Sequence, residues 1–265
     1  MIERIRVADD VELAVDVAAP SDLPVFVLSN SIGANFHMWD EVVPLLEGRL
    51  RLIRYDTRGH GLSDTGTERL TIETLGRDIV TILDRIGIQK AILCGLSLGG
   101  LTAQWLGTSF SERFHGLVLA NTAASFPPAS MWLDRAKTVR DQGLAPLVAP
   151  TLDRWFTRSF RERRPDRIAE IAKMIEGNSA EGYARCCEVL AESDLRESIK
   201  NITLPTRVIC GEHDPSTPPA RGEEIVNLIA NADMTTLNAA HVSSIEAPEA
   251  FANALLGFVG KLKTT

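Results

Sequence analysis

The sequence predicts an α/β protein whose mostly parallel β-sheet is covered by helices on both faces. Three observations lead to this fold class. Short apolar runs that end in polar or small residues alternate with amphipathic helical patterns along most of the chain. The segment ILCGLSLGGL, at residues 92–101, leads from one such run into a serine between two glycines. Residues 126–199 break the alternation, because they contain helical patterns and no strand signal.

The predicted strands are justified by their position in the alternation. Residues 1–17 alternate charged with apolar side chains, which indicates an opening antiparallel pair rather than a signal peptide. The later runs are continuously apolar, as expected of strands that are buried on both faces. We expect these strands at residues 25–30, 50–56, 90–95, 114–121, 206–214 and 234–241.

Two helices of the sheet domain are clear from periodicity. Residues 71–87 place Leu75, Ile79 and Ile82 at helical spacing, and the pattern stops at Gly87. Residues 248–262 repeat this kind of pattern at the end of the chain. Both helices are expected to pack against the sheet.

Three amphipathic helices are expected between the strands at 114–121 and 206–214. Their patterns cover residues 130–143, 165–177 and 178–194. For the third we expect Asn178 as N-cap, with Glu181 three residues later as in a capping box. The dense charge run at 158–167 is interpreted as a solvated connection.

These patterns divide the chain into a core and an insertion. We interpret residues 1–125 and 200–265 as one sheet domain and residues 126–199 as a helical lid. Sheets of this class bind ligands at the carboxyl ends of their strands, so the lid is expected to cover that edge.

Composition and charge exclude several classes of function. The 265 residues carry a net charge of −7 and no basic stripe, which argues against nucleic acid as a partner. No apolar run reaches the roughly 18–20 residues of a membrane span. The four cysteines form neither a CxxC pair nor a metal-ligand spacing, so we expect a reduced, cytoplasmic protein without a metal site. The sequence leaves open whether the protein is a monomer or a small homo-oligomer.

Ser97 is the first candidate catalytic residue. Gly95 and Gly99 lie two residues before and after it, as in a nucleophile elbow. In that turn a strand passes into a helix with a strained corner residue, and the hydroxyl stands beside the positive helix N-terminus. A glycine-rich turn with an idle serine is the alternative, because G-x-S-x-G also occurs by chance.

Two later strand ends supply the partners that a serine nucleophile requires. The order along the chain in such sheets is serine, then an acid, then histidine. Asp214 follows the apolar run at 206–210, and His241 follows the next one. We therefore predict Asp214 as the orienting acid and His241 as the general base, with His213 incidental.

Four segments together give the chain a family resemblance. CGLSLGG, GEHDP, AAHVSSIEAPEAF and YDTRGHGLSD resemble the α/β-hydrolase superfamily over both core segments. Within it, LSNSIGANFHMWDEVVPLL at 28–46 resembles the 3-oxoadipate enol-lactonases of bacterial aromatic catabolism, which have Asn-Ser where most relatives have His-Gly. The resemblance implies an oxyanion hole formed by the backbone N–H groups of Ile32 and Leu98.

The same resemblance implies a reaction. It is hydrolysis of 3-oxoadipate enol-lactone through an acyl-enzyme, with water as the second substrate and without metal or organic cofactor. The lactone carries a free carboxylate, so a cation is expected in the lid. We predict Ser31, Trp132 and Arg135 as substrate-binding residues, and keep Arg140, Arg154 and Arg185 as alternatives to Arg135.

Other functions remain open at this point. One is a carboxylesterase or cofactor-free perhydrolase, although those relatives usually retain His-Gly at the first turn. The others are an acyltransferase that uses the same three residues, and a non-enzymatic ligand sensor on a hydrolase scaffold.

Overall fold

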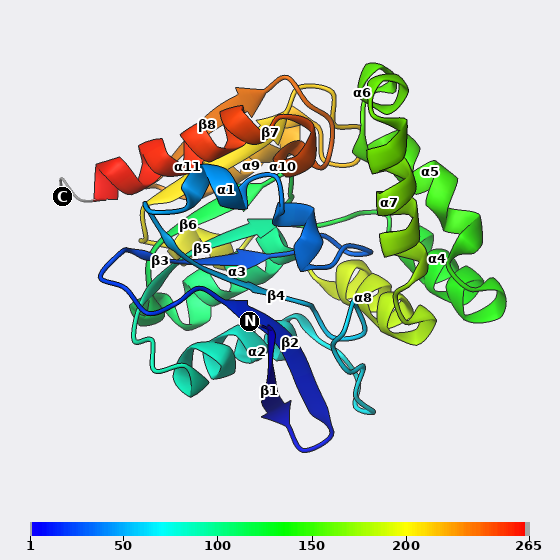
Figure 1. Cartoon of the computed structure of the whole chain (residues 1–265), viewed down its shortest axis with the longest axis horizontal. Coiled ribbons are helices and arrows are strands. Elements are labelled where there is room, and N and C mark those ends of the chain that lie inside the picture. Colours follow the sequence, from blue (N-terminus) through cyan, green and yellow to red (C-terminus); the bar gives the residue numbers. More distant parts are fainter. Residues whose placement is uncertain (1, 263–265) are drawn as a thin grey trace.

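A computed structural model describes residues 2–262, and it contains an eight-stranded sheet with the order β1-β2-β4-β3-β5-β6-β7-β8 (Figure 1). Met1 and residues 263–265, which the predicted core includes, lie outside the described residues. The strands are β1 (Ile2–Ala8), β2 (Val11–Val17), β3 (Val25–Ser29), β4 (Arg51–Tyr55), β5 (Ala91–Leu96), β6 (Phe114–Ala120), β7 (Thr206–Gly211) and β8 (Ala232–Leu237).

The strand directions agree with the predicted fold class. β2 pairs antiparallel with both β1 and β4, whereas β4, β3, β5, β6, β7 and β8 pair with their neighbours in parallel. Parallel neighbours need a crossover, and helices supply most of these crossovers. The carboxyl ends of the central strands therefore meet at one edge of the sheet.

Helices cover both faces of the sheet, as the alternating pattern predicts. Leu75 and Ile79 of α2 and Leu101 of α3 belong to the buried cluster on one face. Phe251 and Leu255 of α11 belong to a second cluster on the opposite face. The helices of the sheet domain are η1 (Phe36–Trp39), α1 (Val43–Leu46), α2 (Ile72–Arg85), α3 (Leu98–Ser109), η2 (Ser111–Arg113), η3 (Ser198–Asn201), α9 (Pro219–Leu228), α10 (Ser243–Glu246) and α11 (Pro248–Leu262).

The region between β6 and β7 contains five α-helices among the described residues, where three were predicted. Figure 1 shows them grouped at one end of the sheet. They are α4 (Ala129–Gln142), α5 (Ala145–Trp155), α6 (Arg158–Arg163), α7 (Pro165–Glu176) and α8 (Ala180–Glu192). We refer to residues 129–192 as the helical insertion.

The sequence prediction missed α5 because prolines interrupt its pattern. Pro146 lies in the first turn, where a missing N–H costs nothing, but Pro150 lies inside the helix. The apolar residues Val148, Leu152 and Trp155 nevertheless recur at helical spacing, and they pack in the second buried cluster. Tertiary packing of this face stabilises a helix that propensity disfavours.

The charge run at 158–167 is not a plain connection, so this interpretation was wrong. It forms α6 and the start of α7. Phe160 anchors α6 in the core, and the Thr157 side chain caps the helix by accepting a hydrogen bond from the Phe160 N–H. The surrounding charges form ion pairs, such as Arg158 with Glu162.

The predicted N-cap of α8 was wrong by one residue. The hydroxyl of Ser179, not the side chain of Asn178, accepts from the N–H of Gly182. Asn178 is buried, and its amide bonds to two loops of the sheet domain instead. Tertiary hydrogen bonds thus displaced the local capping pattern.

Candidate active site

Ser97 occupies the sharp turn between β5 and α3. Its backbone has φ 57° and ψ −111°, a left-handed conformation that side-chain-bearing residues rarely adopt. A Cβ on Gly95 would lie 2.0 Å from the carbonyl oxygen of Gly99, and a Cβ on Gly99 would lie 2.3 Å from that of Ser29. Both neighbours must therefore be glycine, which is the condition that the elbow motif implied.

Asp214 and His241 lie together in the loops that follow β7 and β8. His241 Nδ1 is 2.8 Å from Asp214 Oδ2, and both residues are buried. The predicted strands at 206–214 and 234–241 end earlier than expected, at Gly211 and Leu237. Both residues therefore lie on loops that hydrogen bonds hold in place, and not on the strands themselves.

Four further hydrogen bonds fix the Asp214 carboxylate. The N–H groups of Ser216 and Thr217 donate to Oδ1 over 2.8 and 3.0 Å. The Thr217 hydroxyl and the Asn121 amide donate to Oδ2 over 2.7 and 3.1 Å. Burial by itself raises the pKa of Asp214, but His241 and the two Thr217 donors outweigh it and hold the pKa below its ordinary value. The carboxylate is thus kept ionised against His241.

Asn121 is a residue of this site that the sequence analysis overlooked. It follows β6 with φ 43°, and its amide also donates to the carbonyl of Ala240, next to His241. The hydroxyl of Ser243 donates to the Asn121 side-chain oxygen over 2.5 Å. A polar residue directly after a buried strand was the available signal, because such positions meet at the carboxyl edge.

The N–H groups of Ile32 and Leu98 have no acceptor among the described residues, whereas their neighbours do. The N–H of Gly99 donates to the carbonyl of Asn30, and that of Gly33 donates to His60 Nε2. Two free amides beside a helix N-terminus are the arrangement that an oxyanion hole requires.

His60 and Asn178 brace the loop that contains Ile32. His60 accepts from the Gly33 N–H over 3.0 Å, while Asn178 donates to the Gly33 carbonyl over 2.8 Å. Burial lowers the pKa of His60 to about 4, so the ring is neutral and Nε2 is free to accept. A residue of the sheet domain and one of the helical insertion thus hold the two peptide groups on either side of the Gly33 Cα.

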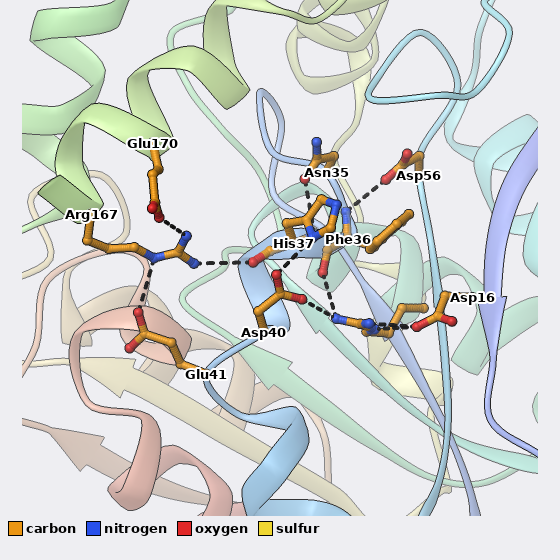
Figure 2. A network of polar contacts seen from close by, with 10 residues as sticks. Asp16, Asn35, Phe36, His37, Asp40, Glu41, Asp56, Arg167 and Glu170 are labelled. Atoms are coloured by element: carbon orange, nitrogen blue, oxygen red, sulfur yellow. Dashed lines mark hydrogen bonds and ion pairs between the residues drawn. The ribbon is translucent and has the colours of Figure 1, made fainter. Parts of the chain in front are cut away.

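The continuation of this loop is held by a polar network (Figure 2). Asp56 accepts from the N–H of Phe36, and Arg54 donates to Asp40 and Asp16. Arg167 of α7 bonds to Glu41 and to the carbonyl of His37. Figure 2 shows Arg167 approaching the loop from the insertion on the side opposite to Asp16.

The segment YDTRGHGLSD, at residues 55–64, acts as a structural brace. Arg58 makes a buried bidentate ion pair with Asp78 of α2, over 2.6 and 2.7 Å. Asp56 also accepts from the N–H of Leu62. Trp39 likewise serves packing: it is fully buried against Phe251.

A cavity of about 260 Å³ lies between the strand ends and the helical insertion. Among the residues predicted for the site, it brings together Ser31, Ile32, Ser97, Trp132, Arg135 and His241. The Asp214 side chain lies outside the lining, where it contacts His241. Much of the remaining lining consists of Phe126, Thr151, Arg154, Trp155 and Tyr183, and of these the sequence analysis names only Arg154 as a candidate.

The arginine candidates separate clearly in space. Arg135 and Arg154 line the cavity. Arg140 and Arg185 do not: both pair with Glu181, and Arg185 also binds the carbonyls of residues 66 and 68. The predicted alternatives Arg140 and Arg185 therefore stabilise the insertion rather than the cavity.

Within residues 2–262, no helix combines the length and apolar character needed to cross a bilayer. No group of three or more histidine, cysteine or acidic side chains in this range is placed to hold a metal ion. All four cysteines are buried and free.

The chain is similar to known proteins over nearly its whole length. The family described as "alpha/beta hydrolase fold" matches residues 24–248. The chain is 41% identical to 3-oxoadipate enol-lactonase 2 of Acinetobacter baylyi, over 94% of this chain and 93% of that protein. It is 39% identical to enol-lactonase 1 of the same organism, over 95% and 94% of the two chains.

A solved structure gives the same result. The crystal structure of the enol-lactonase from Burkholderia xenovorans LB400 superposes with a TM-score of 0.93 at 36% identity, over 96% of this chain and 99% of that chain. The elbow at Ser97, the parallel sheet and these matches lead to one conclusion: the chain belongs to the α/β-hydrolase fold family.

Proposed function

We propose that this protein hydrolyses 3-oxoadipate enol-lactone to 3-oxoadipate. One observation carries the proposal: Ser97, on a strained turn, lines the same small cavity as His241. The Nδ1 atom of His241 is hydrogen-bonded to the buried Asp214, which leaves Nε2 for the serine. The enol-lactonase names of relatives at 39–41% identity over nearly the whole chain support the substrate. Ser31, the second residue of the Asn30-Ser31 pair that the sequence resemblance singled out, lines this cavity.

The acylation step uses three side chains and two amides. His241 Nε2 takes the proton of Ser97 while the serine oxygen attacks the lactone carbonyl. The N–H groups of Ile32 and Leu98 stabilise the resulting oxyanion, and removing one such donor typically costs about 10²–10³ in kcat. Asp214 holds the ring of His241 in the tautomer that leaves Nε2 as the base. Collapse breaks the ring C–O bond and leaves an enolate on the same chain as the acyl group that is now bonded to Ser97. The enolate takes the proton held by His241, which returns the imidazole to its neutral form, and becomes the ketone.

Deacylation repeats the same chemistry with water. His241 removes a proton from water, and the hydroxide attacks the acyl-Ser97 carbonyl. The tetrahedral intermediate again lies at Ile32 and Leu98. Its collapse returns the proton to Ser97 and releases the product with a second carboxylate. The enolate is a better leaving group than an alkoxide, so the ring opening needs little acid assistance.

We further infer that residues 126–199 act as a lid and that Ser31, Trp132 and Arg135 contact the substrate. All three side chains line the cavity that also contains Ser97. The indole N–H of Trp132 donates to the carbonyl of Phe126. The guanidinium carbon of Arg135 lies over the Trp132 ring, 4.6 Å from its centroid. This fixes Trp132 as a wall rather than a mobile side chain.

Turnover of purified protein on the enol-lactone tests the proposal. We expect rapid hydrolysis, with much slower hydrolysis of simple aryl esters. Ser97→Ala should lower kcat by at least about 10³-fold at unchanged far-UV circular dichroism, because it removes the nucleophile. Preferred turnover of aryl esters, of peroxide with a carboxylic acid, or of acyl-CoA would contradict the assignment. Residual activity of Ser97→Ala within a few-fold of wild type would remove Ser97 from the mechanism.

The cellular setting is also an inference. Free cysteines buried in the core suit a reducing compartment, so we place the protein in the cytoplasm. A gel-filtration measurement would decide between a monomer and a small homo-oligomer.

A further inference from the structure

The cavity is cationic inside an acidic protein. The chain carries a net charge of −7, yet Arg135 and Arg154 line the cavity together and no aspartate or glutamate does. Neither arginine forms an ion pair with any of the described residues 2–262. Other cations of the insertion have acidic partners, for example Arg161 with Asp153 and Lys137 with Asp141.

Leaving two like charges unpaired in a partly buried space costs free energy. Burial lowers the pKa of Arg154 from its ordinary value, and the positive charge of Arg135 lowers it further. Structural arginines usually avoid this cost through a carboxylate partner. Two unpaired guanidinium groups facing one cavity therefore indicate that an anion from outside the protein neutralises them.

The side chains around the two arginines hold them without using all of their donors. Arg135 stacks on Trp132, and Arg154 donates to the hydroxyl of Thr151 over 3.1 Å. Each guanidinium has five N–H donors, so both retain donors for a ligand. The positive charges of Arg135 and Arg154 lower the pKa of the neighbouring Tyr183, but burial outweighs them and raises it to about 12. Tyr183 is therefore a neutral hydroxyl and not an anionic partner for the arginines.

We propose that Arg154 and Arg135 form a two-arginine anion site that binds the carboxylate of the substrate in the cavity that Ser97 also lines. A planar guanidinium binds a carboxylate through two parallel hydrogen bonds, which fixes both its position and its orientation. The site selects small esters and lactones with a short carboxylate-bearing chain. This inference rests on the proposed function, and it adds Arg154 as a specificity-determining residue on α5.

Inhibition by adipate, a simple six-carbon dicarboxylate, tests the site independently of the natural substrate. The assay follows hydrolysis of the neutral ester p-nitrophenyl acetate at constant ionic strength. Adipate should inhibit the wild-type enzyme competitively. Arg154→Gln and Arg135→Gln should each raise its inhibition constant by about 10- to 100-fold, the loss expected for a charged hydrogen-bond partner. The KM for the neutral ester should change much less.

Matched controls separate recognition from structure. Lys137→Gln removes an exposed charge from the same helix as Arg135, and Arg158→Gln removes one from α6; both should leave adipate inhibition unchanged. Arg154→Lys retains the charge but not the planar group, so its inhibition constant should lie between those of wild type and Arg154→Gln. This variant also serves if glutamine at position 154 prevents folding.

The outcomes distinguish this inference from the proposed function. If the wild-type enzyme cleaves p-nitrophenyl acetate but not the enol-lactone, the proposed function is wrong, while adipate still tests the anion site. If adipate fails to inhibit the wild type, the anion site is wrong even where the enol-lactone is hydrolysed. Equal losses on ester and adipate in Arg154→Gln would show a structural role and overturn the proposal.

Discussion

At the scale of single residues, the surroundings of Asp214 explain why an aspartate is needed there. Its carboxylate accepts five hydrogen bonds, and each partner is a donor: the Ser216 and Thr217 N–H groups, the Thr217 hydroxyl, the Asn121 amide and His241. An acceptor-only group satisfies all of them. A neutral amide would place its own donors against at least one of these partners.

Asp214→Asn should therefore lower kcat by several orders of magnitude. The amide favours the wrong tautomer of His241 and cannot stabilise the imidazolium. Steady-state kinetics on the enol-lactone checks this prediction, with Glu212→Gln as control, because Glu212 is exposed and only two residues away. If Glu212→Gln lowered kcat more than Asp214→Asn, Asp214 would not be the acid that orients His241.

At the scale of elements, Asn178 connects the helical insertion to the loop of Ile32. Its amide accepts from the N–H of Gly61 over 2.8 Å and donates to the carbonyl of Gly33 over the same distance. The start of α8 and two loops of the sheet domain are thus joined at one buried side chain. The position of the insertion is therefore coupled to that of the free Ile32 amide.

We expect Asn178→Ala to lower kcat by about 10-fold with little change in KM, since it loosens the loop of Ile32, the proposed oxyanion donor, rather than a proposed binding contact. Ser179→Ala is the matched control. It removes the N-cap of α8, at a cost of about 1 kcal/mol in stability, but the Ser179 hydroxyl bonds to the N–H of Gly182 in α8 and not, within residues 2–262, to the Gly33 loop. Equal kinetic effects of the two substitutions would show that general destabilisation is the cause.

The contact between α4 and α8 predicts a pH dependence. Hydrogen bonds from Arg140 and Arg185 lower the pKa of Glu181 to about 2 from its ordinary value of 4.5. A lowered pKa means that the ionised form stabilises the folded state above about pH 4.5, and that this contribution vanishes as the pH falls toward 2.

Urea unfolding of wild type and Glu181→Gln between pH 6 and about pH 3 tests this dependence. The wild type should have the higher free energy of unfolding at pH 6, and the difference should shrink as the pH falls. A difference that stays constant with pH would exclude Glu181 as the titrating group.

At the scale of the whole molecule, the insertion and the sheet domain share their cores. One buried cluster joins Leu117 and Leu119 of β6 to Ala136 and Val139 of α4. The other joins strand and α11 side chains to Leu152, Trp155, Phe160 and Ile171 of the insertion. Figure 1 shows the insertion seated on the sheet edge rather than separated from it by a linker.

The protein should therefore unfold in one cooperative transition. Tryptophans allow the test, because Trp39 and Trp105 lie in the sheet domain and Trp132 and Trp155 in the insertion. In a Trp39→Phe/Trp105→Phe variant, fluorescence reports the insertion, and in the reciprocal double variant it reports the sheet domain. The midpoints by fluorescence and by circular dichroism should coincide in each variant. Earlier loss of insertion fluorescence would reveal an independent unit.

The sequence alone determined the sheet and the identity of the candidate residues at its edge. Strands buried on both faces are continuous apolar runs, and a turn such as that at Ser97 tolerates only glycine at positions 95 and 99. These are local constraints, so they are written in adjacent residues. The order of Ser97, Asp214 and His241 follows from the same topology, since parallel strands end at one edge.

Only the tertiary structure decided which side chains of the insertion face the cavity. Arg135, Arg140, Arg154 and Arg185 are alike in sequence, yet two line the cavity and two pair with Glu181. The same holds for Asn178, whose local capping pattern was overruled by partners 117 and 145 residues away in sequence. Helix periodicity gives the direction of a side chain relative to its own helix, but the neighbour it meets depends on how α4, α5 and α8 pack together.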